Sequence, residues 1–326
     1  MVLTGYHHLT AITDDLRASH DLMTRVLGMR LVKRAVNEDG GGWHLFYGDG
    51  AGTPGATISF FHWTSAREQR GTSSIVRIGL RVPPASLDFW AARLTDSGAI
   101  VRAQRVGSWD TLACDTDAGL RLSLIADGPG PAGAVHHATD VPPDCQIRGL
   151  GGVALSVHDG VNSEWFLTAM LGMQPVGEWD GAADGGRVMA FAMPAAPPGP
   201  AGQVHVLVQP DLAPARQGPG AVHHLAFCTP DDAGGLGFRQ RLLSHGFHIG
   251  PQIDRRYFKS VYCREPGGNL LEIATQGPGF TVDEPLDQLG RNLKLPPEMD
   301  HQRAALLVAF PQLDEGGTGN RARSGS

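Results

Sequence analysis

Residues 7–28 read "HHLTAITDDLRASHDLMTRVLG", and this stretch decides the fold because its pattern returns three more times along the chain. It begins with alternating apolar and polar residues, which is typical of a β-strand. Asp14 or Asp15 can then cap a helix, apolar residues recur at helical spacing, and Gly28 ends the helix. Further strand-like runs follow at residues 29–36, 42–49 and 56–63.

The spacing within this unit is nearly constant in all four copies. The distance from a residue in the first strand to the glycine that ends the helix is 20, 20, 20 and 22 residues. The four steps are His8 to Gly28, Ile78 to Gly98, Gly152 to Gly172 and His224 to Gly246. We therefore predict an α+β fold built from four βαβββ modules, because chance does not hold such a register four times.

Composition shifts divide the modules into two pairs. A Pro- and Gly-rich stretch separates the pairs, and the end of the chain is polar and poor in apolar residues. The expected organisation is modules one and two at 1–126, a linker at 127–148, modules three and four at 149–280, a C-terminal extension at 281–314 and a disordered tail at 315–326.

Length and charge exclude several classes of function. With 326 residues, 41% of them hydrophobic, the chain resembles an ordinary globular protein, and its net charge of −6 gives no basic surface for nucleic acid. No apolar run reaches the roughly 20 residues of a membrane span, and the first residues lack a secretory signal pattern. We expect a cytoplasmic protein whose four scattered cysteines are reduced.

Histidine doublets stand in equivalent first strands of two modules, His7–His8 in module one and His223–His224 in module four. Side chains alternate along a strand, so we expect one histidine of each doublet to face inward and the other to face outward or toward the edge of the sheet. A third doublet, His136–His137, falls in the linker and is predicted to be a solvated loop pair. Three further histidines on strand-like segments have no evident partner and are expected to be structural: His44, His62 and His205.

One carboxylate stands in the last strands of these modules. Module four has Glu272 where modules one and two have Ser59 and Ser123. Two imidazoles and one carboxylate with open positions form the ligand set of non-haem Fe(II) oxygenases, whereas a closed structural zinc site needs a fourth ligand. Across the cupped face of a sheet, the doublets and Glu272 are therefore candidates for a metal site.

Two long segments carry a family resemblance. Together with the doublets, "YFKSVYCREPGGNLLEIAT" (257–275) and "GPGFTVDEPLDQLG" (277–290) resemble the vicinal oxygen chelate superfamily of glyoxalases, bleomycin resistance proteins and extradiol dioxygenases. Within it, the chain is similar to two-domain ring-cleaving dioxygenases that act on hydroquinones, over residues 4–311. The resemblance implies two cupped mixed β-sheets with helices outside, with modules one and four packed together around the metal.

The resemblance also implies roles for particular residues. The metal ligands would be the second histidine of each doublet and the single glutamate: His8, His224 and Glu272. The remaining residues would act in catalysis beside the substrate: His7, His223, Thr10, Arg255 and Tyr262. Arg255 is preferred to Arg256 from its distance to Glu272. From the residues alone, Arg255 equally fits a surface ion pair and Tyr262 fits strand packing.

The function implied is ring cleavage of a hydroquinone-like or catechol-like aromatic by an extradiol-type dioxygenase that uses Fe(II), with Mn(II) as an alternative, and inserts both atoms of O2. His7 or His223, with an ordinary pKa near 6.5, would carry protons. Two alternatives stay open: a metal-dependent glyoxalase-type isomerase or lyase, and a metal-free resistance protein that binds an aromatic antibiotic. The expected partners are a small aromatic substrate and O2, without nucleic acid or membrane; a homo-oligomer stays open.

Overall fold

The structure is a computed structural model that describes all residues except 38–41, 129–131, 182–184, 310–312 and 314–326. The first two modules follow the predicted order of strand, helix and three strands. Module one comprises β1 (Gly5–Thr13), α1 (Leu16–Asp21), β2 (Arg30–Val36), β3 (Trp43–Gly48) and β4 (Thr57–His62). Module two comprises β5 (Ser74–Val82), α2 (Leu87–Asp96), β6 (Ile100–Val106), β7 (Trp109–Asp115) and β8 (Arg121–Ala126).

The second half of the chain repeats this order after the short strand β9 (Gly149–Leu150). Module three comprises β10 (Val153–Val157), α3 (Gly160–Trp165), β11 (Gln174–Asp180), β12 (Arg187–Ala192) and β13 (Gln203–Val208). Module four comprises β14 (Val222–Thr229), α4 (Asp232–Ser244), β15 (Ile253–Asp254), β16 (Lys259–Arg264) and β17 (Leu270–Thr275). The extension adds β18 (Leu293–Lys294) and α5 (Arg303–Ala309).

The helices begin and end where the sequence indicates. Asp15, rather than Asp14, caps α1 by accepting a hydrogen bond from the Ala18 amide, and one π-helical turn over Leu22–Val26 extends that helix. Gly28 has a φ of +68°, a conformation that lets the chain leave the helix and that favours glycine. Among the described residues, no helix is long and apolar enough to cross a membrane.

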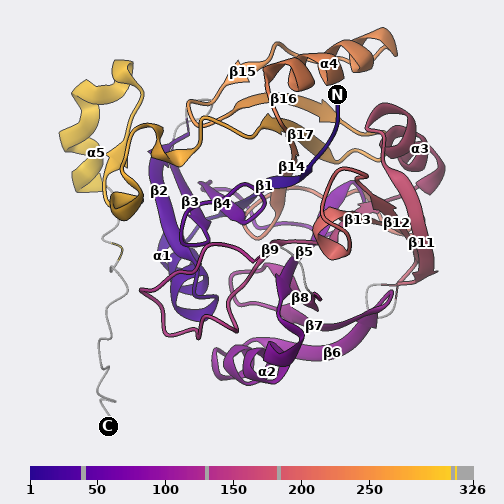
Figure 1. The fold of residues 1–326 in the computed structure, drawn as a ribbon, viewed down its shortest axis with the longest axis horizontal. Coiled ribbons are helices and arrows are strands. Elements are labelled where there is room, and N and C mark those ends of the chain that lie inside the picture. The colour runs from indigo at the N-terminus through magenta and orange to yellow at the C-terminus, as the bar shows by residue number, and fades with distance from the viewer. Residues whose placement is uncertain (38–41, 129–131, 182–184, 310–312, 314–326) are drawn as a thin grey trace.

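The four modules form two mixed sheets, each built from one module of the first half of the chain and one of the second half. Modules one and four share one sheet, in the order β15-β16-β17-β14-β1-β4-β3-β2-β18. Modules two and three share the other, in the order β11-β12-β13-β10-β5-β8-β7-β6, with β9 beside β5. The sheets are curled and α2, α3 and α4 lie at the periphery (Figure 1), so the predicted α+β fold is confirmed.

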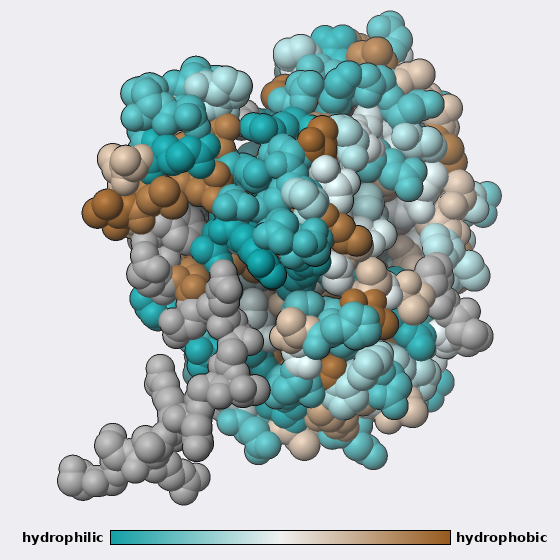
Figure 2. All heavy atoms as spheres, turned by 60° about the vertical axis from the view of Figure 1, so that its left-hand side comes forward, coloured by the Kyte–Doolittle hydropathy of each residue, from teal (hydrophilic) through white to brown (hydrophobic). Residues whose placement is uncertain are grey.

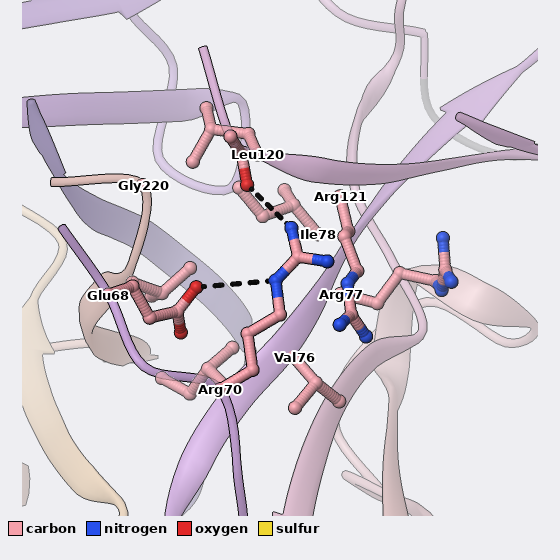
Figure 3. Close-up of a pocket in the computed structure, with 11 residues that line it drawn as sticks. Glu68, Arg70, Val76, Arg77, Ile78, Leu120, Arg121 and Gly220 are labelled. Atoms are coloured by element: carbon pink, nitrogen blue, oxygen red, sulfur yellow. Dashed lines mark hydrogen bonds and ion pairs between the residues drawn. The ribbon is translucent and has the colours of Figure 1, made fainter. Parts of the chain in front are cut away.

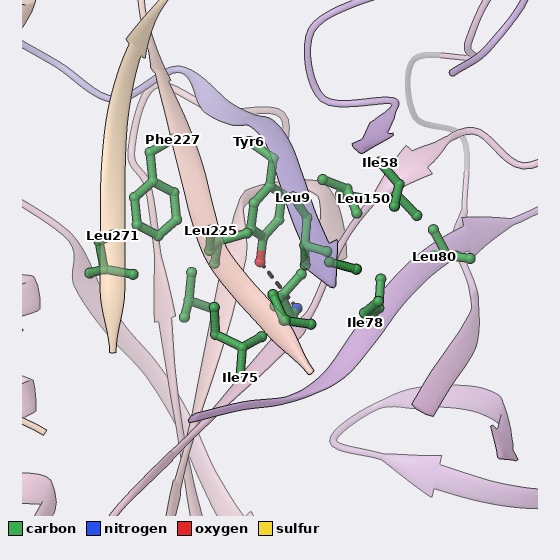
Figure 4. Packing of buried hydrophobic residues seen from close by; sticks show 14 of the residues in the cluster. Tyr6, Leu9, Ile58, Ile75, Ile78, Leu80, Leu150, Leu225, Phe227 and Leu271 are labelled. Atoms are coloured by element: carbon green, nitrogen blue, oxygen red, sulfur yellow. Dashed lines mark hydrogen bonds between the residues drawn. The ribbon is translucent and has the colours of Figure 1, made fainter. Parts of the chain in front are cut away.

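The main core lies between the two sheets. Leu9 of β1, Leu225 of β14, and Ile78 and Leu80 of β5 are 1% exposed or less and converge there (Figure 4). Because side chains alternate along β1, the residues on either side of Leu9 face the other side of the sheet, inside its curve. Burying Leu9 in the core therefore directs His8 and Thr10 into the concave face.

The C-terminal extension lies along the edge of the first sheet, where β18 pairs in parallel with β2. Its helix α5 exposes Leu307 and Val308, whereas most of the surface on this side of the molecule is hydrophilic (Figure 2). The predicted disordered tail at 315–326 lies outside the described residues. The division of the chain at 127–148 stays a prediction.

Candidate metal centre

Three side chains from three adjacent strands meet on the concave face of the first sheet. They are His8 of β1, His224 of β14 and Glu272 of β17, each 3% exposed or less. His8 Nε2 lies 3.2 Å from His224 Nε2 and 3.4 Å from Glu272 Oε2, and His224 Nε2 lies 2.9 Å from the same oxygen. Among the described residues, this is the only group of at least three His, Cys, Asp or Glu side chains whose ligand atoms converge in this way.

The donor atoms fit one divalent cation. Three ligand atoms held at right angles about 2.1 Å from a metal lie about 3.0 Å from one another, close to the distances observed. Glu272 Oε2 is buried and, among the described residues, has no aligned hydrogen-bond donor. Burial acts to raise the pKa of Glu272, but His8 and His224 outweigh it and hold that pKa well below its usual range. Burial lowers the pKa of His224, which favours the neutral imidazole that metals bind.

Each histidine doublet contains a β-bulge, which corrects the prediction that its two side chains face opposite ways. Between β1 and β14, Tyr6 pairs with Phe227 and His8 with Ala226, so His7 is an extra residue without a partner in the ladder. In the same way, Thr10 pairs with His224 and Ala11 with Val222, so His223 is the extra residue in β14. A bulge re-aims side chains, and here it lets both imidazoles of a doublet meet.

Three neighbours hold the candidate ligands in place. His7 Nδ1 lies 2.8 Å from His8 Nδ1, and His223 Nδ1 lies 2.7 Å from His224 Nδ1. When each ligand uses Nδ1 for this bond, its Nε2 is left for a metal. Ser260 Oγ of β16 donates a hydrogen bond to Glu272 Oε1. These contacts orient the ligand atoms toward the cation site.

The same burial makes His7 and His223 unsuited to carry protons near neutral pH, contrary to the prediction from their ordinary pKa. Burial, together with a smaller effect of the adjacent ligand histidine, lowers the pKa of each to about 3. Neither histidine is among the residues that line the cavity in front of the candidate ligands. Both therefore serve as hydrogen-bond partners of neutral imidazoles behind the site.

An open cavity lies in front of His8 and His224. Its walls are largely aromatic, and the rings that line it are Phe46, Phe61, Tyr257, Phe258 and Tyr262. Its polar groups besides the ligands are Thr10, Asn37, His44 and Arg255. An aromatic molecule of modest size fits these walls, and the polar groups are few enough to fix its orientation.

Three of the predicted substrate contacts line this cavity. Thr10 Oγ1 lies 3.0 Å from His224 Nε2, on the edge of the candidate cation site. The Arg255 guanidinium lies over the Tyr262 ring at 5.4 Å, and burial raises the pKa of Tyr262, so its hydroxyl keeps its proton. Arg256 instead points to Asp283, so of the two adjacent arginines Arg255 is the one in the cavity.

His44 lines the cavity, which is a further correction because the sequence placed it among the structural histidines. Its Nε2 lies 3.0 Å from Ser59 Oγ, which also bonds Thr10 Oγ1 at 2.8 Å. Ser59 pairs with Thr10, two residues after His8, and Glu272 pairs with Ala226, two residues after His224. His44 and Ser260 thus hold matching places in their modules, a relation that aligning the third strands of modules one and four would have revealed.

The remaining sequence-predicted histidines lie away from this site. His205 is buried in the second sheet, with its ring 5.1 Å from that of Trp179. His62 ends β4, partly exposed. His136 is partly buried and His137 exposed in the loop before β9, as predicted for a loop pair.

A second, small cavity is lined by arginines rather than metal ligands. Arg70, Arg77 and Arg121 approach it together with Glu68 (Figure 3). Arg70 donates a hydrogen bond to the Gly119 carbonyl at 3.1 Å and lies 3.6 Å from the Glu68 carboxylate. Because its lining contains three arginines, this cavity does not suit a cation.

Comparisons with known proteins agree with this architecture. Residues 5–124 and 149–273 match the sequence model described as "Glyoxalase/Bleomycin resistance protein/Dioxygenase superfamily". The chain is 38% identical to "Putative ring-cleaving dioxygenase MhqA" of Bacillus subtilis, over 94% of this chain and 98% of that protein. It is 27% identical to "Chlorohydroquinone/hydroquinone 1,2-dioxygenase" of Sphingobium indicum, over 93% and 94%. A crystal structure of a "putative dioxygenase" from Bacillus subtilis superposes with a TM-score of 0.88 at 30% identity, over 96% of this chain and 98% of that one.

Proposed function

This chain belongs to the glyoxalase/bleomycin resistance protein/dioxygenase superfamily, and from that premise we propose that it is a ring-cleaving dioxygenase. Its substrate would be a hydroquinone-like or catechol-like aromatic, opened with O2 at a non-haem Fe(II) centre, with Mn(II) as the alternative ion. The similarity to a protein named as a chlorohydroquinone/hydroquinone 1,2-dioxygenase supports the substrate class. The observation that carries the proposal is the convergence of His8, His224 and Glu272 beside an aromatic cavity that the two histidines line.

The residues around this set suit that chemistry. Fe(II) held by the two imidazoles and the carboxylate would supply positions for a phenolate oxygen and for O2, and would mediate electron transfer between them. His7 and His223 orient the ligand imidazoles, and Ser260 orients the carboxylate. The aromatic walls hold the ring of the substrate and exclude water from it.

The polar cavity residues act on the oxygen atoms of the substrate. Thr10 Oγ1, on the edge of the cation site, is placed to accept a hydrogen bond from a hydroxyl group bound there. Arg255 and Tyr262 lie on the side of His224, where a guanidinium and a phenol can stabilise negative charge that develops on oxygen. His44 presents a further polar contact through its place beside Ser59.

Two alternatives on the same fold are less well supported. A glyoxalase-type isomerase uses a fourth protein ligand, but the matching position holds Ser59, whose hydroxyl bonds Thr10 and His44. A metal-free binding protein has no need of a buried carboxylate whose Oε2 lacks an aligned donor, since an unsatisfied buried group costs stability.

Oxygen uptake tests the proposal directly. Protein reconstituted with Fe(II) without air is mixed with hydroquinone, methylhydroquinone or catechol, O2 is admitted, and uptake is followed with the absorbance of the ring-opened product. We expect uptake matched to substrate, and none from Zn(II)-loaded protein or from Glu272→Gln. Iron-replete protein that consumes no O2 with any of these diphenols would refute the dioxygenase assignment.

A further inference from the structure

A partly buried carboxylate links the C-terminal extension to the wall of the cavity. Asp283 accepts hydrogen bonds from Lys33 Nζ of β2 at 2.8 Å and from Tyr257 OH at 3.1 Å, and its Oδ2 lies 3.0 Å from Arg256 Nε. Lys33 is fully buried. Asp283 lies in the long segment that the family resemblance rests on, yet it is not part of the metal site.

The turn that Asp283 contacts is strained. Arg256 has a φ of +68°, which residues other than glycine rarely adopt, and the Tyr257 amide donates to the Arg255 carbonyl at 2.8 Å across it. Such three-residue turns are rare and persist only where the surroundings hold them. The residues on either side of Arg256 both line the cavity, so this turn sets where Arg255 and Tyr257 lie.

Asp283 is not needed to neutralise Lys33. The Lys33 ammonium also donates to Glu284 Oε2 at 3.0 Å and to the Phe280 carbonyl at 3.1 Å. Glu284 itself accepts from the amide and side chain of Asn292, which fixes the extension independently. The other two side-chain partners of Asp283, Arg256 and Tyr257, both belong to the strained turn.

We propose that Asp283 is a positioning residue for substrate binding: by holding Arg256 and Tyr257 it keeps the strained turn in the form that presents Arg255 and Tyr257 to the cavity. This inference rests on the proposed function for its effect on substrate, but its structural part does not. The phenol of Tyr257 turns its hydroxyl toward Asp283 and its ring toward the cavity, so loss of the carboxylate changes the wall without touching the metal ligands.

The test compares Asp283→Asn with a control variant, Asp127→Asn, which removes the charge of an ion-paired carboxylate far from the turn. Asp127 is 5% exposed and accepts from Arg81 Nη1 at 2.8 Å, at the end of β8 in the other sheet. Three measurements are made on each full-length protein: amide hydrogen exchange of peptides covering residues 254–259, Fe(II) content, and kcat and KM for a diphenol. Thermal denaturation reports the general loss of stability in both variants.

For Asp283→Asn we expect an unchanged Fe(II) content and amide exchange about tenfold faster at residues 254–259, because the turn loses its charge-assisted hydrogen bonds. We also expect KM to rise about tenfold, with a smaller decrease in kcat. Asp127→Asn should lose similar thermal stability with wild-type exchange at 254–259 and wild-type KM. Equal exchange at 254–259 in the two variants overturns the proposal.

The experiment separates a failure of the proposed function from a failure of the proposal for Asp283. If wild-type protein consumes O2 with no diphenol, the proposed function fails, and the exchange comparison still decides whether Asp283 holds the turn. If Asp283→Asn does not fold, Tyr257→Phe removes only the hydroxyl that meets Asp283 and keeps the ring in the cavity. That variant should show faster exchange at 254–259 and a higher KM, with a smaller change in each; wild-type values of both would refute the proposal.

Discussion

Replacing Ser260 with alanine tests whether contacts behind the ligands set the affinity for the metal. Ser260 is 0% exposed, and its hydroxyl donates to a carboxylate that is also 0% exposed. Hydrogen bonds to charged groups contribute about 1.5–3 kcal/mol, and about 1.4 kcal/mol corresponds to a tenfold change in an equilibrium constant. Ser260→Ala should therefore bind Fe(II) about 10- to 100-fold more weakly, the range typical of groups that orient metal ligands.

The assay is anaerobic competition for Fe(II) against a coloured chelator. Ser123→Ala is the matched control, because Ser123 is a buried serine of β8 whose hydroxyl has no hydrogen-bond partner among the described residues. The control should keep wild-type affinity, because it removes no hydrogen bond. If Ser260→Ala holds Fe(II) as tightly as Ser123→Ala does, the Glu272 carboxylate is not oriented by Ser260 and the reasoning from this geometry is wrong.

Three further predictions concern folding and the ligand set. Burial lowers the pKa of His205 to about 4, so on acidification the unfolded chain binds a proton at this histidine before the folded chain does. The free energy of unfolding should therefore fall by about 3 kcal/mol as the pH drops from 6.5 to 4. In urea titrations, His205→Gln should lack this part of the pH dependence. Gly79→Ala would place a Cβ 1.7 Å from the Gly151 carbonyl oxygen and should lower the free energy of unfolding by about 3 kcal/mol or more, whereas Gly128→Ala, with open space, should stay within about 0.5 kcal/mol in thermal denaturation. Ser59→Glu should retain bound metal but abolish O2 uptake, because a second carboxylate takes a position that the substrates need.

Each of these has a result that contradicts it. Parallel stability curves for wild type and His205→Gln between pH 4 and 6.5 would show that His205 titrates normally. A Gly79→Ala protein as stable as Gly128→Ala would mean that the segment after β9 does not approach β5 as closely as described. Undiminished O2 uptake by metal-loaded Ser59→Glu would remove the argument that an open position separates this site from that of a four-ligand isomerase.

The module order and the association of the two histidine doublets with Glu272 could be predicted from local periodicity, whereas the choice of His8 and His224 within the doublets came from the family resemblance. Strand alternation and a constant 20-residue step reveal the repeats, and matching positions within a repeat are brought to matching places in a sheet. The bulges at His7 and His223 could not be predicted, since an extra residue in a ladder depends on how two distant strands align. The alternation rule therefore gave the wrong facing for one histidine of each doublet.

Side-chain contacts between residues on different strands could not be predicted from the sequence either. An alignment of the third strands of modules one and four shows that His44 and Ser260 hold matching places, but their contacts with Ser59 and Glu272 depend on the strand register. The link between Lys33 and Asp283 joins residues 250 positions apart and depends on the path of the extension over β2. Pairings of this kind require the tertiary structure, because neither partner carries a periodic signal.

The pairing of β1 with β14 also has a consequence for biosynthesis. His8 and His224 are 216 positions apart, and Glu272 is translated later still. A nascent chain on the ribosome therefore holds only one of the three candidate ligands through most of its synthesis. The complete candidate metal site therefore forms only after the fourth module has emerged and paired with the first.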